Sequence, residues 1–167
     1  MSVKETIRSQ YYAALEMLKQ AVEACPEALW DDPQYESPFW HIAYHALFYT
    51  HLYLQNSGQE FVPWSKSRQE YEFLGPLPWP PHREPNIGEP YSKEDILEYL
   101  DFCRNEVEEQ VPTMDLEAAS GFYWLPFDKL ELQFYNIRHI QQHTGELYER
   151  LGAAGGPELG WVGMKRE

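Results

Sequence analysis

Four amphipathic segments, separated by breaks that prolines mark, constrain the fold of this chain more than any other feature. In each segment, apolar residues recur at the three- and four-residue spacing of a helix. Pro26 and Pro112 follow the first and third segments, and proline disfavours helical geometry in the residue before it. No strand pattern and no internal repeat is found, so the chain is predicted to be all-α, with four helices in a bundle. The segments cover residues 3–25, 38–55, 92–111 and 129–151.

The residues at the segment boundaries predict where the helices begin and end. Ser37 is the expected N-cap of the second helix, with Pro38 at the first helical position, where its missing N–H costs nothing. Ser92 and Asp95 resemble a capping box at the start of the third helix. Gly152 is expected to cap the C-terminus of the fourth helix. Apolar residues predict the buried face of that helix: Leu130, Phe134, Ile137, Ile140, Leu147 and Leu151.

A long irregular segment, residues 56–91, joins the second helix to the third. It is rich in proline, and Trp64 and Trp79 lie among the prolines. The aromatic residues indicate that the segment packs over the bundle, and its length allows the second and third helices to run in the same direction. A tolerated insertion without a role is the other interpretation. We therefore expect one bundle over residues 1–152 and an irregular, glycine-containing tail over residues 153–167.

Composition excludes several classes of protein. The 167 residues include 13 Lys and Arg against 27 Asp and Glu, a net charge of −14, and there is no basic patch. Such a charge disfavours contact with nucleic acids and anionic membrane surfaces. The two cysteines are too few for a disulfide scaffold, and no segment has the character of a signal peptide or a membrane span. The sequence predicts a cytoplasmic protein that binds neither nucleic acids nor membranes.

Two histidine pairs are the main chemical feature of the sequence. His41 and His45 lie four residues apart in the second helix, as His139 and His143 do in the fourth. Residues at this spacing share one helix face, so both imidazoles of a pair can bind one metal ion. Core histidines that bond to a tyrosine or a carboxylate are the alternative, and the spacing fits both interpretations.

Other catalytic patterns do not fit these pairs. Residue 140 is Ile, where a His-Glu-x-x-His metalloprotease helix needs its glutamate. Residues 136, 38 and 42, each three before a paired histidine, are Asn, Pro and Ile, so the Glu-x-x-His motif of di-iron bundles is absent. The sequence also has no phosphate-binding glycine loop and no nucleophile elbow.

Two stretches resemble a known family. Residues 136–147, Asn-Ile-Arg-His-Ile-Gln-Gln-His-Thr-Gly-Glu-Leu, resemble the last-helix motif of the DinB/YfiT-like superfamily. Residues 38–49, Pro-Phe-Trp-His-Ile-Ala-Tyr-His-Ala-Leu-Phe-Tyr, resemble its second helix, which supplies one further histidine. The resemblance implies a four-helix bundle with up-up-down-down topology, and a divalent metal ion, zinc or nickel, held by three histidines.

The resemblance also implies the ligands and the chemistry. It assigns His139, His143 and His45 as metal ligands, with His41 as an alternative or additional one. Three imidazoles leave coordination positions open, as in catalytic sites, and an open ion lowers the pKa of bound water or of a thiol. The implied function is a metal-dependent enzyme, a thiol S-transferase or a hydrolase, which acts on a small molecule such as a low-molecular-weight thiol. A homodimer is also implied.

Further candidate residues and two other functions stay open. Glu146 lies one turn from His143 and is a candidate base or ligand-orienting group, although a solvated surface carboxylate fits as well. Trp64 and Trp79 are candidates for lining a substrate pocket. The alternatives to an enzyme are a non-catalytic metal-binding or stress-response protein, and a metal-free helical dimerisation module.

Overall fold

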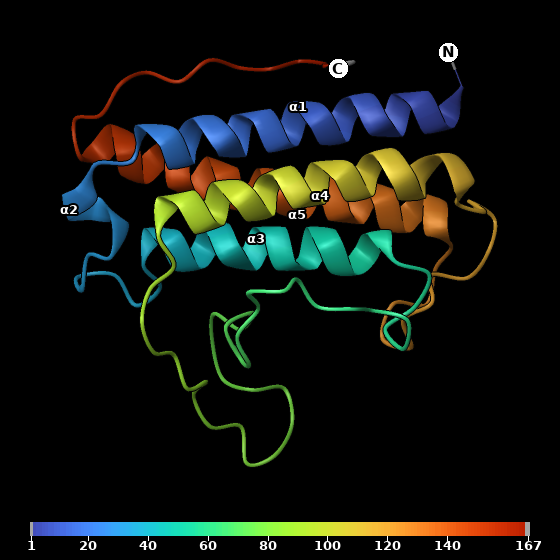
Figure 1. Cartoon of the computed structure of the whole chain (residues 1–167), viewed down its shortest axis with the longest axis horizontal. Coiled ribbons are helices and arrows are strands. Elements are labelled where there is room, and N and C mark those ends of the chain that lie inside the picture. Colours follow the sequence, from blue (N-terminus) through green and yellow to red (C-terminus); the bar gives the residue numbers. More distant parts are fainter. Residues whose placement is uncertain (1, 166–167) are drawn as a thin grey trace.

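The protein is all-helical, as predicted, over residues 2–165, the range that the computed structural model describes (Figure 1). Within these residues there is no strand, and one isolated bridge pairs Ala119 with Asp128. None of the helices there combines the length and apolar character needed to cross a membrane. The helices are α1 (Val3–Ala24), α2 (Glu27–Trp30), α3 (Phe39–Leu54), α4 (Lys93–Thr113) and α5 (Lys129–Ala153).

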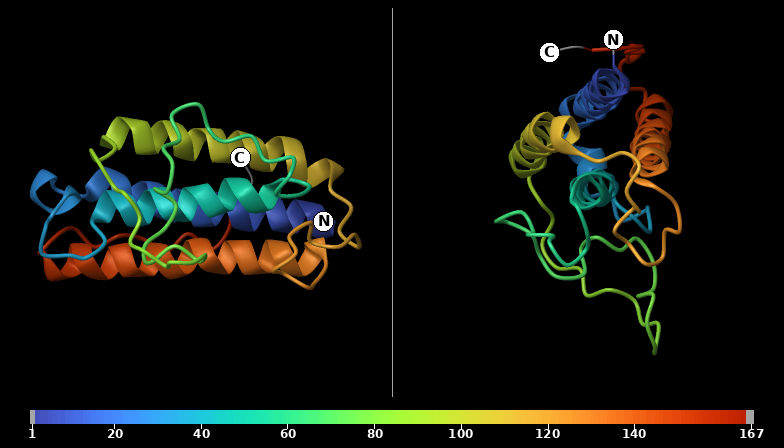
Figure 2. Two further views of the ribbon diagram at one scale, coloured as in Figure 1. Left: turned by 90° about the horizontal axis from the view of Figure 1, so that it is seen from below. Right: turned by 90° about the vertical axis from the view of Figure 1, so that its right-hand side faces the viewer.

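Four long helices form a bundle in which α1 and α3 lie on opposite corners. α1 packs against α4 and α5, and α3 packs against the same two helices, as the end-on view in Figure 2 shows. The short α2 follows Pro26 in the link between α1 and α3, where the sequence analysis expected no helix. The bundle therefore places α3 directly beside α5, and these two helices carry the histidine pairs.

The order of helix directions differs from the expected one. Figure 1 shows α1 and α5 running from right to left, and α3 and α4 running from left to right. The topology is up-down-down-up, so the expected up-up-down-down order is wrong. A parallel α1 and α3 would need a link that returns along the whole of α1, about 33 Å for its length. The actual link, residues 25–38, contains α2 and stays at one end of the bundle.

The parallel pair is α3 and α4, and the long segment between them makes it possible. Residues 55–92 contain no helix or strand, and they lead from the end of α3 back to the start of α4 (Figure 1). The segment packs against the bundle through Trp64, whose ring is stacked 4.4 Å from that of Tyr99 and lies 5.9 Å from that of Tyr91. Residues 154–165 return along α1 without helix or strand.

Two expected helix starts and stops are displaced. Pro38, not Ser37, is the N-cap of α3, and no side chain caps this end. α4 continues through Pro112 to Thr113, where the sequence predicts a stop before the proline. Pro112 lies in the last turn, and the helical hydrogen bond that it cannot donate would go to the carbonyl of Glu108. Glu108 is exposed, so water can take that place and the helix continues.

The C-terminus of α5 also lies beyond the expected residue. The helix passes through Gly152 to Ala153, and the glycine with a left-handed φ of +73° is Gly155. The N–H of Gly155 donates to the carbonyl of Gly152, and the N–H of Gly156 donates to the carbonyl of Leu151. Gly155 therefore has the role that the sequence assigned to Gly152, because Ala153 continues the helix and Ala154 is its C-cap.

The buried face of α5 is more polar than predicted. Phe134 was expected on this face, but it is 63% exposed, whereas Gln133 and Asn136 are fully buried. The hydroxyl of Tyr11 on α1 donates to Gln133 and accepts a hydrogen bond from Asn136. These bonds offset part of the desolvation of the two amides, although Oδ1 of Asn136 has no hydrogen-bond partner within residues 2–165, so polar residues can occupy inward positions at helical spacing.

Lys129 joins the segments at the end of α3 and the start of α5. Its side chain is buried, and its ammonium donates to the carbonyls of Gln55, Asn56 and Ser120 at 3.3, 2.9 and 3.2 Å. Burial lowers the pKa of Lys129. This contact fixes residues 114–128, the link between α4 and α5, against the end of α3.

We expect Lys129→Met to lower the free energy of unfolding by about 2 kcal/mol, because it leaves at least the buried Ser120 carbonyl without a donor. Lys19→Met is the matched control, since within residues 2–165 the ion pair of Lys19 is a 3.8 Å contact with Glu23 on the surface of α1. The control should change stability by less than about 0.5 kcal/mol in urea denaturation. Equal effects of the two substitutions would contradict the role of Lys129.

Candidate metal centre

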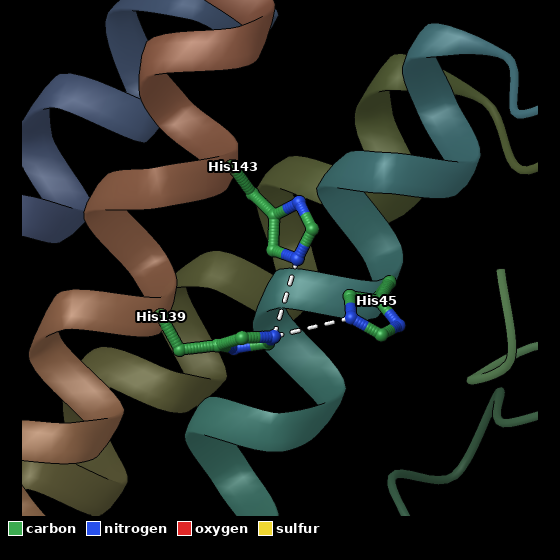
Figure 3. A group of neighbouring side chains, drawn as sticks. All are labelled: His45, His139 and His143. Carbon is green, nitrogen blue, oxygen red and sulfur yellow. Dashed lines mark hydrogen bonds between the residues drawn. The ribbon is translucent and has the colours of Figure 1, made fainter.

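Three histidines from two helices point at one another across the contact between α3 and α5. His45 comes from α3, and His139 and His143 come from α5 (Figure 3). The Nε2 atom of His139 lies 3.1 Å from that of His45 and 3.2 Å from that of His143. One nitrogen from each ring lies within 4.8 Å of the other two. The structure thus brings together three of the four paired histidines.

The hydrogen bond of His45 fixes where its proton lies. Its Nδ1 atom lies 2.6 Å from the backbone carbonyl oxygen of Glu72 in the segment 55–92. A carbonyl only accepts hydrogen bonds, so Nδ1 carries the hydrogen and donates it. In the neutral ring, Nε2 then presents a lone pair toward His139.

His143 is held in the same way by a carboxylate. Its Nδ1 atom lies 3.4 Å from Oε2 of Glu146, one turn further along α5. Oε1 of Glu146 accepts a hydrogen bond of 2.8 Å from Arg150, which also donates to the carbonyl of Ser37 at 2.7 Å. Glu146 is thus anchored to the link before α3 and orients His143, so Nε2 of His143 also presents a lone pair.

Converging lone pairs make this group a suitable set of metal ligands. Nε2 of His139 faces both of the others, and its buried Nδ1 has no hydrogen-bond partner within residues 2–165. A proton on Nε2 of His139 can point at only one of the two lone pairs, whereas a cation can accept the lone pairs of all three Nε2 atoms. In a tetrahedral site with metal–nitrogen bonds of 2.0–2.1 Å, ligand nitrogens lie about 3.4 Å apart. The separations of 3.1 and 3.2 Å are close to that value.

The three rings are neutral at physiological pH. Burial, together with the neighbouring His143, lowers the pKa of His45 to about 3 and that of His139 to about 4. Burial also lowers the pKa of His143, although Glu146 opposes this shift. Because an imidazole binds metal only when it is deprotonated, the site is ready to bind at neutral pH.

His41 lies outside this group. Its Nε2 atom is 2.8 Å from the carbonyl oxygen of Tyr71, and its buried ring stacks on Trp40 with centroids 5.0 Å apart. His51 is similar, since its Nδ1 lies 3.1 Å from the hydroxyl of Tyr99. Both are core histidines with hydrogen-bond partners, the alternative that the sequence analysis considered for all paired histidines.

An aromatic pocket of about 540 Å³ lies beside the three histidines. Tyr49 is shared by the two sites, because it lines the pocket and its ring lies 4.9 Å from that of His45 and 5.5 Å from that of His139. Trp79 lines this pocket, whereas Trp64 packs on Tyr99 and borders a different hollow. The pocket is lined by Phe48, Tyr49, Leu52, Tyr53, Glu72, Phe73, Pro78, Trp79, Tyr123 and Trp124.

Sequence reasoning missed several of these residues. Tyr49 follows His45 by four residues and so shares its helix face, which is a signal that the sequence contains. Glu72 orients His45 through its backbone, and no side-chain pattern predicts a backbone contact. Tyr123 and Trp124 lie in the short link between α4 and α5, and only the fold brings them to the pocket.

Comparison with known families identifies a relationship. The model of a family described as the DinB superfamily matches residues 10–147, a range that includes all three converging histidines. Neither the curated proteins nor the solved structures gave a match.

The hydrogen bonds predict the tautomers of the rings. In metal-free protein at pH 7, we expect His45 and His143 to be neutral and to carry their hydrogen on Nδ1. Two-bond ¹H–¹⁵N correlation spectra distinguish this form from the Nε2-protonated one, and His45→Gln provides the assignment. A hydrogen on Nε2 of His45 would contradict the proposed orientation of the lone pairs.

Proposed function

The chain belongs to the DinB superfamily, and on this premise we propose that it is a metal-dependent enzyme whose ion is held by His45, His139 and His143. The observation that supports this most is the convergence of three Nε2 atoms, two of which have lone pairs fixed by hydrogen bonds from Nδ1. Imidazole ligands favour zinc or nickel among the divalent ions. Three protein ligands leave room for a substrate or water.

In this proposal, the residues around the three histidines orient the imidazole rings. The Glu72 carbonyl and the Glu146 carboxylate hold the rings of His45 and His143 and keep their lone pairs directed inward. Arg150 fixes Glu146, so this carboxylate is a positioning group and not a free base. A divalent ion supplies Lewis-acid chemistry, which lowers the pKa of a coordinating thiol or water. A thiol S-transferase or a hydrolase that acts on a small molecule is the matching reaction class.

The adjacent pocket favours an enzyme over the other two functions. A storage or structural site needs no ligand cavity, whereas this pocket shares Tyr49 with the histidines. A metal-free dimerisation module would leave the lone pairs of His45 and His143 both directed at Nε2 of His139, which can donate a proton to only one of them. The homodimer and the cytoplasmic location remain predictions from the sequence.

We expect the purified, untagged protein to hold about one equivalent of divalent metal. His45→Gln should weaken zinc binding by at least about 100-fold, because one ligand of three is lost. His41→Gln is the matched control, since glutamine can still donate to the Tyr71 carbonyl and His41 lies outside the group. Elemental analysis and competition with a chromogenic chelator measure both effects. Metal below about a tenth of an equivalent after incubation with zinc, or equal losses in the two variants, would contradict the proposed site.

Activity is tested with a panel of thiols and electrophiles, together with ester and amide substrates. We expect turnover that disappears with a chelator, returns with zinc or nickel, and falls by at least about 100-fold in His143→Ala. If the metal binds stoichiometrically but no member of the panel turns over, the non-catalytic metal-binding function is favoured instead.

A further inference from the structure

The pocket beside the histidines combines aromatic walls with one acidic side chain. Three segments contribute to it: the C-terminal half of α3, the segment 55–92 and the link 114–128. Tyr49 and Tyr53 come from α3, with ring centroids 5.6 Å apart. Phe73 and Trp79 meet edge to face at 5.4 Å, as Tyr123 and Trp124 do at 4.9 Å. Aromatic side chains from three separate parts of the chain therefore line the pocket.

Glu72 is the one residue with a charged side chain among those that line the pocket. No lysine, arginine or histidine within residues 2–165 forms an ion pair with its carboxylate. A half-buried carboxylate without a cationic partner carries a desolvation cost that a positively charged ligand would offset.

We propose that this pocket binds an organic cation, an amine or quaternary ammonium group attached to an apolar body. Aromatic faces attract cations through their quadrupole, and a carboxylate adds a Coulombic contribution. The volume of about 540 Å³ suits a small molecule rather than a metal ion or a protein segment. An anionic ligand is disfavoured by Glu72 and by the net charge of −14.

The place of the pocket makes this cation a substrate or a part of one, an inference that rests on the proposed function. Tyr49 lines the pocket and its ring lies beside those of His45 and His139, and the backbone of Glu72 bonds to His45. A ligand whose charged group lies near Glu72 can therefore extend its other end toward the three histidines. The exposed rim, in which Tyr123 is 95% and Trp79 51% exposed, leaves the entrance open.

The test compares two ligands of nearly equal shape. At pH 8, 2-phenylethylamine is a cation and 2-phenylethanol is neutral, and titration calorimetry or tryptophan fluorescence measures the binding of each to the full-length protein. We expect the amine to bind at least about 10-fold more tightly than the alcohol. Phenylacetate, the anionic relative, should bind more weakly than the alcohol.

Two variants assign the binding to this pocket. Glu72→Gln should remove the preference for the amine over the alcohol, whereas Glu109→Gln, a matched loss of charge on the exposed face of α4, should leave it unchanged. Trp79→Ala should weaken the binding of both ligands by about 5- to 10-fold. Trp79 is half exposed, so this substitution should leave the fold intact. Equal affinities for amine and alcohol, an unchanged preference in Glu72→Gln, or no binding of either ligand would overturn the proposal.

The same titrations separate this inference from the metal proposal. The preference for the amine should persist in His143→Ala, because His143 does not line the pocket. If the preference persists there while the wild-type protein binds no metal, the proposed function fails and the cation pocket stands. If the metal binds but the amine has no preference, only the cation pocket fails. Closure of the rim by a second copy of the chain would appear as a dimer that excludes both ligands, and would count against the proposal.

Discussion

The contact between α3 and α5 is the constraint on which the site depends. The two helices lie side by side because α1 and α3 occupy opposite corners of the bundle, each packed against α4 and α5. The pair His139 and His143 shares one face of α5, and this contact adds His45 from α3. A bundle with α3 and α5 on opposite corners would separate His45 from the other two histidines, so the arrangement of the helices determines whether the three rings meet. The up-down-down-up order requires a long return segment between α3 and α4. Glu72, whose carbonyl bonds to His45, belongs to that segment.

The polar groups around the histidines come from parts of the chain that are remote in sequence. Glu72 belongs to the long segment under α3, while Glu146 and Arg150 belong to α5 and reach the carbonyl of Ser37 before α3. Each bond orients one imidazole so that its lone pair is directed inward, while burial lowers the pKa of the ring and keeps it neutral. The ordering of the segment 55–92 and the orientation of His45 therefore depend on each other, and the aromatic pocket is built on the same segment.

The sequence predicts the helices and the shared helix face of the histidine pair in α5 well, because both depend on local spacing. Helical periodicity locates four of the five helices to within a few residues, and the spacing of His139 and His143 follows from 3.6 residues per turn. Phe134 was placed wrongly because the hydroxyl of Tyr11, on another helix, allows Gln133 and Asn136 to be buried. The choice between His41 and His45, the helix directions and the carbonyl of Glu72 depend on tertiary packing, and no local pattern encodes them.

X-ray absorption at the zinc edge tests the central claim most directly. Protein reconstituted with one equivalent of zinc should show three nitrogen ligands at about 2.0–2.1 Å, with the multiple-scattering pattern of imidazole rings and one further light atom. The structure predicts that this pattern loses one imidazole in His45→Gln and stays unchanged in His41→Gln. A zinc spectrum dominated by sulfur ligands or by water and carboxylate oxygens would contradict the account, because the ion would then lie away from the three converging histidines.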